Sequence, residues 1–188
     1  MRIFSISPSG VTESATLPTQ APDQGYVWIA CARTEFETLR EEVQATLQAL
    51  TGTTLVDLHI SDLLNKQLPS RFDYTSMYDL LVFRRLSSGQ GEAAPAPSGE
   101  PPLVPRRRGG PPVLRRIDTS PIGFAVFDQL LLTVHPPDCA ARDAYATRLL
   151  AAASASAETR AANVDPRLGG ARLPASPSDL MLRIVNQI

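Results

Sequence analysis

The stretch GFAVFDQLLLTVH, residues 123–135, carries the strongest fold signal in this chain. Two apolar runs flank the polar pair Asp128 and Gln129, a pattern that predicts a tight β-hairpin. The run YVWIA at residues 26–30 predicts a further buried strand, and YDLLVFRRL at residues 78–86 predicts a long one. The large apolar side chains of these runs form the expected core: Trp28, Phe83, Phe124 and Val126.

The best helix pattern lies between residues 34 and 52, soon after the buried strand. Thr34 and Glu37 have the spacing of a capping box, in which each side chain satisfies a free backbone N–H at a helix start. Gly52 stands where a left-handed C-terminal stop is expected. Between them, one apolar stripe recurs at helical spacing: Phe36, Leu39, Val43, Leu47 and Leu50.

Other segments alternate between helical and extended character. The expected helices are 59–66, 138–159 (with Tyr145, Leu149 and Leu150 as large anchors) and 178–188 (with Leu180, Ile184 and Ile188 on one face). The expected strands are 2–7 and 113–118, and the expected loops are 11–24 and 163–177. Because the apolar pattern of residues 178–188 runs up to the last residue, we expect the chain to be a fragment of a longer protein.

Residues 87–112 differ in composition from the rest of the chain. Twelve of these 26 residues are proline or glycine, and only Leu103 and Val104 are bulky and apolar. Such a stretch buries too little to offset its ordering entropy, so we expect a disordered insertion between two strands that pair with each other. The sequence therefore predicts one α/β domain over residues 1–177, a mixed β-sheet covered by helices on both faces (an α/β/α sandwich).

Composition excludes several classes of protein. The 188 residues include 18 basic and 19 acidic ones, and the net charge of −1 argues against a nucleic-acid-coating protein. Cys31 and Cys139 form no CxxC motif, so a disulfide scaffold or zinc ribbon is not expected. No apolar run approaches the roughly 18–20 residues of a membrane span. We expect a soluble chain, without a signal peptide, in a reducing compartment.

Enzyme motifs such as GxGxxG, GxxxxGK[ST], HExxH and GxSxG do not occur in the chain. His59 and His135 are interpreted as satisfied or surface residues, with a ligand role as the alternative, and no pair of Cys139 with His135 is expected. The carboxylates of Asp57, Asp62, Asp73 and Asp79 do not have the spacing of a metal cage, so each is expected to be solvated. A single carboxylate could still hold a hydrated Mg²⁺ if a second chain supplied another one.

Arginines 106–108, with Arg115 and Arg116 nearby, form the one basic cluster of the sequence. A solubilising patch is the favoured interpretation, and weak contact with anionic lipid headgroups is the alternative. No aromatic residues interleave with these arginines, so base stacking and a nucleic-acid partner are not expected.

From residue 55 onward, LVDLHISDLLN at 55–65 is followed by RFDYTSMYDLLVFR at 71–84 and by the hairpin at 123–135. In order and spacing, these motifs resemble those of CorA-type divalent-cation transporters. The first resembles the family's hPLxLEDxLN segment, and the second its KxExYxxYxFxVL strand. Residues 123–135 resemble its LxxNxLlTvH hairpin, YVWI at 26–29 its early G-x-x-W strand, and 178–188 the approach to its long stalk helix. Departures are Ser61 in place of a frequent Glu, Pro69-Ser70 in place of Arg-Pro, and the insertion.

The resemblance implies a cytoplasmic regulatory domain of a homopentameric transporter of Mg²⁺, or of Co²⁺, Ni²⁺ or Zn²⁺, without catalysis of its own. The Gly-Met-Asn signature and membrane helices would follow residue 188, residues 178–188 would begin the stalk, and the domain would lie on the cytoplasmic side of the inner membrane. Asp62 matches the family's acidic position, at which a regulatory Mg²⁺ binds weakly between subunits.

A soluble α/β domain that binds or converts a small molecule is the alternative class. A convergent polar pocket, with a His or Asp of perturbed pKa, would favour that alternative.

Overall fold

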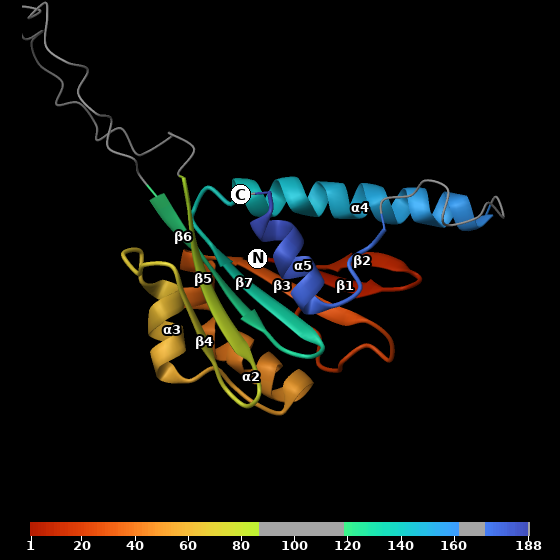
Figure 1. The fold of residues 1–188 in the computed structure, drawn as a ribbon. Helices are drawn as coiled ribbons and strands as arrows, with labels where there is room; N and C mark the ends of the chain where they lie inside the picture. The colour runs from red at the N-terminus through yellow and green to blue at the C-terminus, as the bar shows by residue number, and fades with distance from the viewer. Residues whose placement is uncertain (87–118, 162–171, 188) are drawn as a thin grey trace, which may run out of the picture.

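The computed structural model describes residues 1–86, 119–161 and 172–187, and within them seven strands form one mixed sheet (Figure 1). The strand order is β2-β1-β3-β7-β6-β5-β4, and all neighbours pair antiparallel except the parallel β3 and β7. The strands are β1 (Arg2–Ser7), β2 (Gly10–Ser14), β3 (Tyr26–Ala32), β4 (Arg71–Tyr74), β5 (Asp79–Leu86), β6 (Thr119–Val126) and β7 (Leu130–His135).

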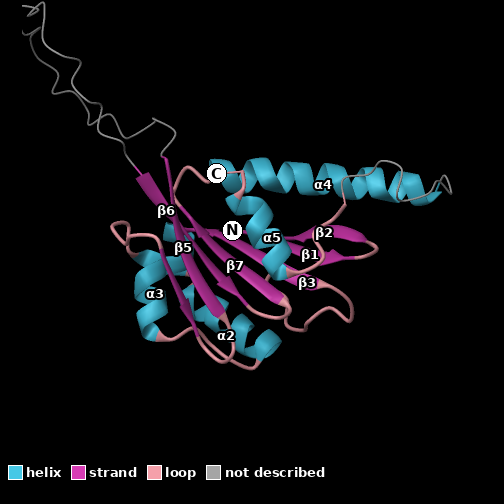
Figure 2. Ribbon diagram, viewed as in Figure 1, coloured by secondary structure: helices cyan, strands magenta, loops and turns pink. Residues whose placement is uncertain are grey.

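Helices cover both faces of this sheet (Figure 2). They are α1 (Arg33–Thr38), α2 (Arg40–Thr51), α3 (Asp57–Leu64), α4 (Ala140–Ala161) and α5 (Pro177–Val185). The first three bury Phe36, Leu47 and Leu63 against one face, while α4 and α5 bury Tyr145 and Leu180 against the other. The expected α/β/α sandwich is confirmed. Among the described helices, none combines the length and the apolar character that a membrane span requires.

The central strands carry the core, as their sequences predict. Every residue of β3 and of β7 is buried, because helices cover both faces of this parallel pair. Trp28 is fully buried, stacks on Phe4 with ring centroids 4.9 Å apart, and donates from Nε1 to Thr133 Oγ1 at 3.0 Å. The expected hairpin is formed by β6 and β7, and Phe127 N donates to Leu130 O at 2.8 Å across its turn.

The expected core needs one correction. Trp28, Phe124 and Val126 are buried, but Phe83 is only half-buried. Phe83 lies on β5, next to the edge strand, whereas α5 lies over β3, β6 and β7. Apolar content alone does not reveal which part of a sheet the helices cover.

The first long helix also differs from its expected form. It begins at Arg33 and is interrupted at Leu39, which separates α1 from α2. The predicted capping box of Thr34 and Glu37 is wrong, since Glu35 Oε2 instead accepts from Ala32 N at 2.7 Å. The predicted stop is confirmed, because Gly52 has φ 74° and its N–H bonds to Gln48 O at 3.0 Å.

The remaining element boundaries combine agreement with correction. Residues 11–24 were expected to be a loop, but 10–14 form β2, an exposed edge strand with little apolar signal. The helix expected at 59–66 is α3, two residues earlier, and the helix expected at 178–188 is α5, which ends at Val185. The alanine-rich helix forms as α4. The predicted insertion at 87–112, the strand at 113–118 and the arginine cluster lie outside the described residues.

Candidate functional site around Asp62

Asp62, the residue that the sequence analysis assigned to a metal, lies on the inner face of α3. The apolar neighbours Ile60 and Leu63 fix this orientation because they pack into the core beneath the helix. Asp62 is 7% exposed, and its Oδ2 accepts from Arg71 Nη1 at 2.9 Å. The expectation of a solvated carboxylate is therefore wrong for Asp62, since the helix turns this side chain toward strand β4.

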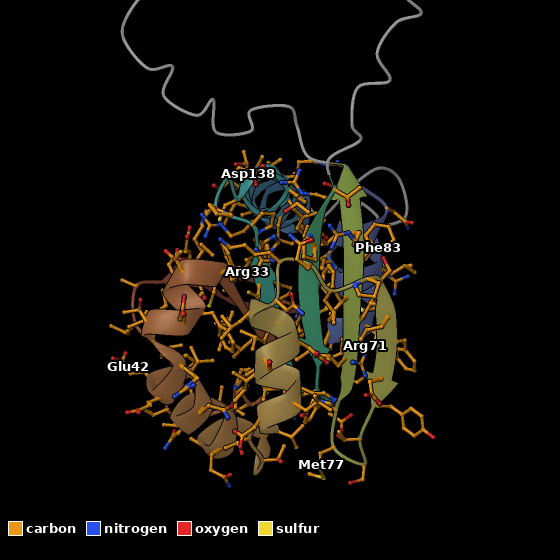
Figure 3. All side chains as sticks on the ribbon, turned by 90° about the vertical axis from the view of Figure 1, so that its left-hand side faces the viewer. Arg33, Glu42, Arg71, Met77, Phe83 and Asp138 are labelled. Carbon is orange, nitrogen blue, oxygen red and sulfur yellow. The ribbon has the colours of Figure 1, made fainter. Side chains whose placement is uncertain are left out.

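Arg71, on the edge strand β4 (Figure 3), bonds to two carboxylates at this site. Its Nη2 donates to Asp73 Oδ2 at 2.8 Å while its Nη1 holds Asp62. Arg71 and Asp73 are each about one-third exposed, so solvent screens part of their attraction. The pKa of Asp73 is lowered by the backbone N–H of Tyr74, then by the hydrogen bond from His59, and also by the nearby charge of Arg71.

His59 connects this ion pair to the core. Val56 N donates to Tyr78 Oη at 3.0 Å, so the Tyr78 hydroxyl proton is free for His59 Nδ1, 2.9 Å away. That arrangement assigns the ring proton to Nε2, which lies 3.4 Å from Asp73 Oδ2. His59 is 3% exposed and both its ring nitrogens have partners, so of the two expected interpretations, satisfied or surface, the first holds for it.

The donor set tests whether a divalent cation fits at Asp62 within one chain. Asp57 and Asp79 are exposed on the surface, whereas Asp62 and Asp73 share the guanidinium of Arg71. In the described part of the chain, no three His, Cys, Asp or Glu side chains are grouped so that they could hold a metal ion. A cation at Asp62 therefore needs ligands from water or another chain, and it competes with Arg71 for the carboxylate.

The second histidine, His135, lies at the end of β7 and is fully buried. Its Nε2 is 2.9 Å from Thr133 Oγ1, and burial, followed by the charges of Arg142 and Arg85, lowers its pKa to about 3. Cys139 Sγ donates to Pro136 O at 3.3 Å. Burial also raises the pKa of both cysteine thiols, so neither is an activated nucleophile.

Two arginines have structural roles that the sequence did not predict. Arg71 occurs only within a quoted motif, and no sequence pattern marks Arg33. Arg33 is 5% exposed and donates to Leu63 O at 3.3 Å and to Pro121 O at 2.8 Å, which ties α1 to α3 and β6. Burial, and secondarily the charge of Arg84, lowers the pKa of Arg33. Both partners of Arg33 lie on other elements, and so does Asp62, the buried partner of Arg71, so no local pattern reveals these contacts.

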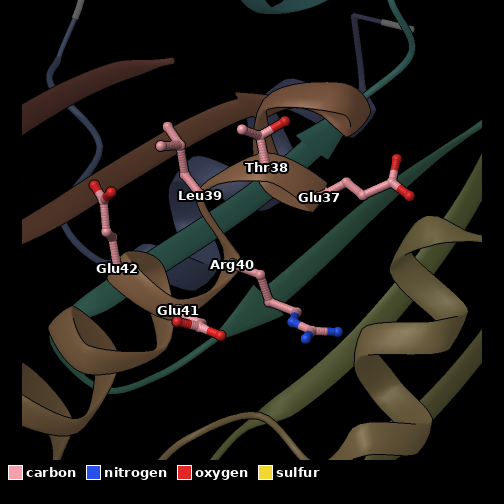
Figure 4. Close-up of a pocket in the computed structure, with 6 residues that line it drawn as sticks. All are labelled: Glu37, Thr38, Leu39, Arg40, Glu41 and Glu42. Atoms are coloured by element: carbon pink, nitrogen blue, oxygen red, sulfur yellow. The ribbon is translucent and has the colours of Figure 1, made fainter.

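A shallow surface pocket occurs at the junction of α1 and α2 (Figure 4). Its volume is about 180 Å³, below the roughly 300–1,000 Å³ of ligand pockets, and its lining is mostly polar. The lining residues are Glu37, Thr38, Leu39, Arg40, Glu41 and Glu42. Four described histidine or aspartate side chains have a shifted pKa, and none of them lines this pocket: Asp73, His135, Asp143 and Asp179. This pocket therefore gives no support to the alternative class.

Known structures share this fold at low sequence identity. The full-length CmaX protein matches with a TM-score of 0.56 and 14% identity, over 100% of this chain and 44% of its own. The CorA magnesium transporter from Methanocaldococcus jannaschii matches with 0.52 and 14%, over 100% and 44%. The ZntB cytoplasmic domain from Vibrio parahaemolyticus RIMD 2210633 matches with 0.50 and 13%, over 99% and 56%.

These likenesses define the class of fold to which the chain belongs. It is an α/β domain with the fold found in the ZntB cytoplasmic domain, in CmaX and in the CorA magnesium transporter, as the sequence resemblance implied. The chain spans about half the length of these three proteins. No protein-family model matches the sequence, and no curated protein matches it.

Proposed function

We propose that this chain is the cytoplasmic domain of a CorA-like divalent-cation transporter. The observation that carries the proposal is that a likeness of fold and a likeness of sequence motifs point to the same kind of protein. The fold agrees with those of CmaX, the ZntB cytoplasmic domain and the CorA magnesium transporter over essentially the whole chain. Separately, the quoted motifs fall on elements of the expected type: the segment at 55–65 on α3, the early strand on β3, and the hairpin at 123–135 on β6 and β7, while the segment at 71–84 is divided between β4 and β5. No catalytic role is proposed.

We further propose that Asp62 belongs to a regulatory Mg²⁺ contact between subunits. Mg²⁺ retains most of its waters and binds through one or two carboxylates, so a single buried carboxylate is a sufficient contribution from one chain. Arg71 holds that carboxylate in the single chain at 2.9 Å. Binding then exchanges Arg71 for the cation, and a neighbouring subunit supplies the second acidic group. Such a site is weak, which suits a sensor of intracellular Mg²⁺.

The same proposal covers assembly and location. In the full-length protein, the domain associates as a homopentamer and is linked to the inner membrane by helices outside this chain, on the cytoplasmic side. Transport of Mg²⁺, or of Co²⁺, Ni²⁺ or Zn²⁺, is the activity of the pore. No nucleic-acid partner is proposed.

Transport by the complete reading frame that contains this chain tests both proposals. Purified and reconstituted in vesicles, it should carry a divalent cation, and internal Mg²⁺ should inhibit that transport. Asp62→Asn should weaken the inhibition, whereas Asp57→Asn, an exposed position on the same helix, should leave it unchanged. In calorimetry, the chain alone should bind Mg²⁺ no more tightly than about millimolar, because one hydrated carboxylate is a weak ligand set.

The outcomes separate the two proposals. Absence of divalent-cation transport by the unmodified protein would refute the transporter assignment. Unchanged Mg²⁺ inhibition in the Asp62→Asn protein would refute only the role of Asp62. Micromolar Mg²⁺ binding to the single chain would refute a site shared between subunits.

A further inference from the structure

The edge strand β4 presents unpaired backbone groups to its surroundings. Among the described strands it pairs with β5 alone, with Arg71 opposite Val82 and Asp73 opposite Leu80. Thr75 N bonds to Tyr78 O at the turn, so the alternation of an antiparallel ladder directs the backbone bonds of Asp73 and Arg71 toward β5. The N–H and C=O of Phe72 therefore point outward, and no described residue bonds to them.

The side chains of this edge are also unusual for an exposed surface. Phe72 is 63% exposed and Tyr74 is 73% exposed, and the two rings stack with centroids 6.3 Å apart. Met77, 52% exposed, follows in the turn at the end of β4 (Figure 3). Edge strands are commonly blunted by charged side chains, proline or a bulge, and β4 carries the charged Arg71 and Asp73 but neither lysine nor proline. Because β4 has only 4 residues, it offers few backbone hydrogen bonds to a partner strand, which predicts weak rather than permanent association.

We infer that β4 pairs with β4 of a second copy of this chain, antiparallel about a two-fold axis at Phe72. In this register, Phe72 N–H donates to the C=O of Phe72 in the other copy, and the reverse bond forms by symmetry. Arg71 then lies opposite Asp73 of the other copy, twice, which places opposite charges across the strands. The two Phe72 rings meet on one face of the joined sheet.

Backbone direction and charge select this register over its neighbours. Residues whose backbone N–H and C=O groups point outward, such as Phe72 and Tyr74, must lie opposite each other to form hydrogen-bonded pairs. The two-fold axis can therefore pass through a residue of β4 but not between two residues. A two-fold axis at Asp73 would place this carboxylate directly opposite the Asp73 carboxylate of the other copy, and like charges in opposite positions are destabilising. An axis at Tyr74 would place at its centre an N–H that already donates to Asp73 Oδ1 at 2.9 Å, whereas an axis at Phe72 leaves that N–H at the end of the pairing.

The opposite edge of the sheet provides an internal comparison. Strand β2 exposes Thr12, Glu13 and Ser14, and Arg2 already holds Glu13 at 2.7 Å. It has no exposed large apolar side chain. The inference goes beyond the proposed function and does not rest on it, because a two-fold contact joins two copies only and cannot close a ring of five.

Sedimentation velocity of the chain at increasing concentration, up to about 1 mM, should show a monomer that passes into a dimer. Phe72→Lys places two like charges at the axis, and Phe72→Pro removes the central N–H without touching the ladder to β5. Each change acts twice in the dimer, so each should weaken association by about tenfold or more. Thr12→Lys, on the β2 edge, should have no effect, and circular dichroism checks that each variant is folded.

Disulfide trapping tests the register itself. A hydrogen-bonded pair has Cα atoms about 5.5 Å apart, within disulfide range, so Phe72→Cys should cross-link on mild oxidation. Tyr74→Cys should not, because position 74 lies opposite position 70 of the other copy. A monomer at every concentration, dimerisation unaffected by both changes at Phe72, or equal cross-linking at 72 and 74 would overturn the inference. A five-copy species insensitive to Phe72 would overturn it too, while supporting the assembly in the proposed function.

Discussion

Acidification from pH 7 to pH 5 should destabilise this fold through one buried side chain, His135. The imidazole is fully buried at the end of β7, with Nε2 2.9 Å from Thr133 Oγ1. Burial, then the positive charges of Arg142 and Arg85, lowers its pKa from 6.5 to about 3. The folded protein therefore keeps His135 neutral throughout this pH range, whereas the unfolded chain takes up a proton.

The size of the effect follows from proton linkage. The folded-state pKa lies below the unfolded value, so this contribution to stability is fully present above about pH 6.5 and is lost progressively as the pH falls toward 3. The limiting slope for one proton is about 1.4 kcal/mol per pH unit. Between pH 7 and pH 5, the free energy of unfolding should fall by about 2 kcal/mol on account of His135.

Urea unfolding followed by the fluorescence of Trp28, the single tryptophan, measures this change. His135→Gln keeps an acceptor for Thr133 but carries no titrating group, so its free energy of unfolding should depend much less on pH. Carboxylates such as Glu35 and Asp143, whose pKa values are lowered, titrate mainly below this window and are common to both proteins. Equal pH dependence in the two proteins between pH 7 and pH 5 would refute the reasoning.

Two further predictions concern packing and are measured by the same urea titrations. Gly25→Ala should lower the free energy of unfolding by at least about 2 kcal/mol, because φ is 96° and a Cβ would overlap the Ile6 carbonyl oxygen. Gly52→Ala, with φ 74° and open space around the Cβ, should lower it by only about 1 kcal/mol. Equal losses in the two variants would contradict the clash at Gly25. Phe124→Ala should cost about 3–5 kcal/mol and the half-buried Phe83→Ala about 1–2 kcal/mol, and a larger loss at Phe83 would contradict its observed exposure.

Local patterns in the sequence were sufficient for much of the fold. They predicted four features: the hairpin of β6 and β7, the strand β3, the apolar stripe of α1 and α2, and the helix stop at Gly52. Each of these depends on interactions within a few residues or on burial of a continuous apolar run. The assignment of an α/β/α sandwich follows from the alternation of such elements.

The edge strands and the Asp62 site were decided only by the tertiary structure. No side chain of β2 or β4 is buried, so no buried apolar face separates these strands from loops, and only pairing with β1 and β5 defines them. Asp62 is buried beside the guanidinium of Arg71, which lies on another element. Phe83 is half-exposed because it lies on β5, whereas α5 lies over β3, β6 and β7. These features arise from contacts between elements, whose partners leave no trace in the local sequence.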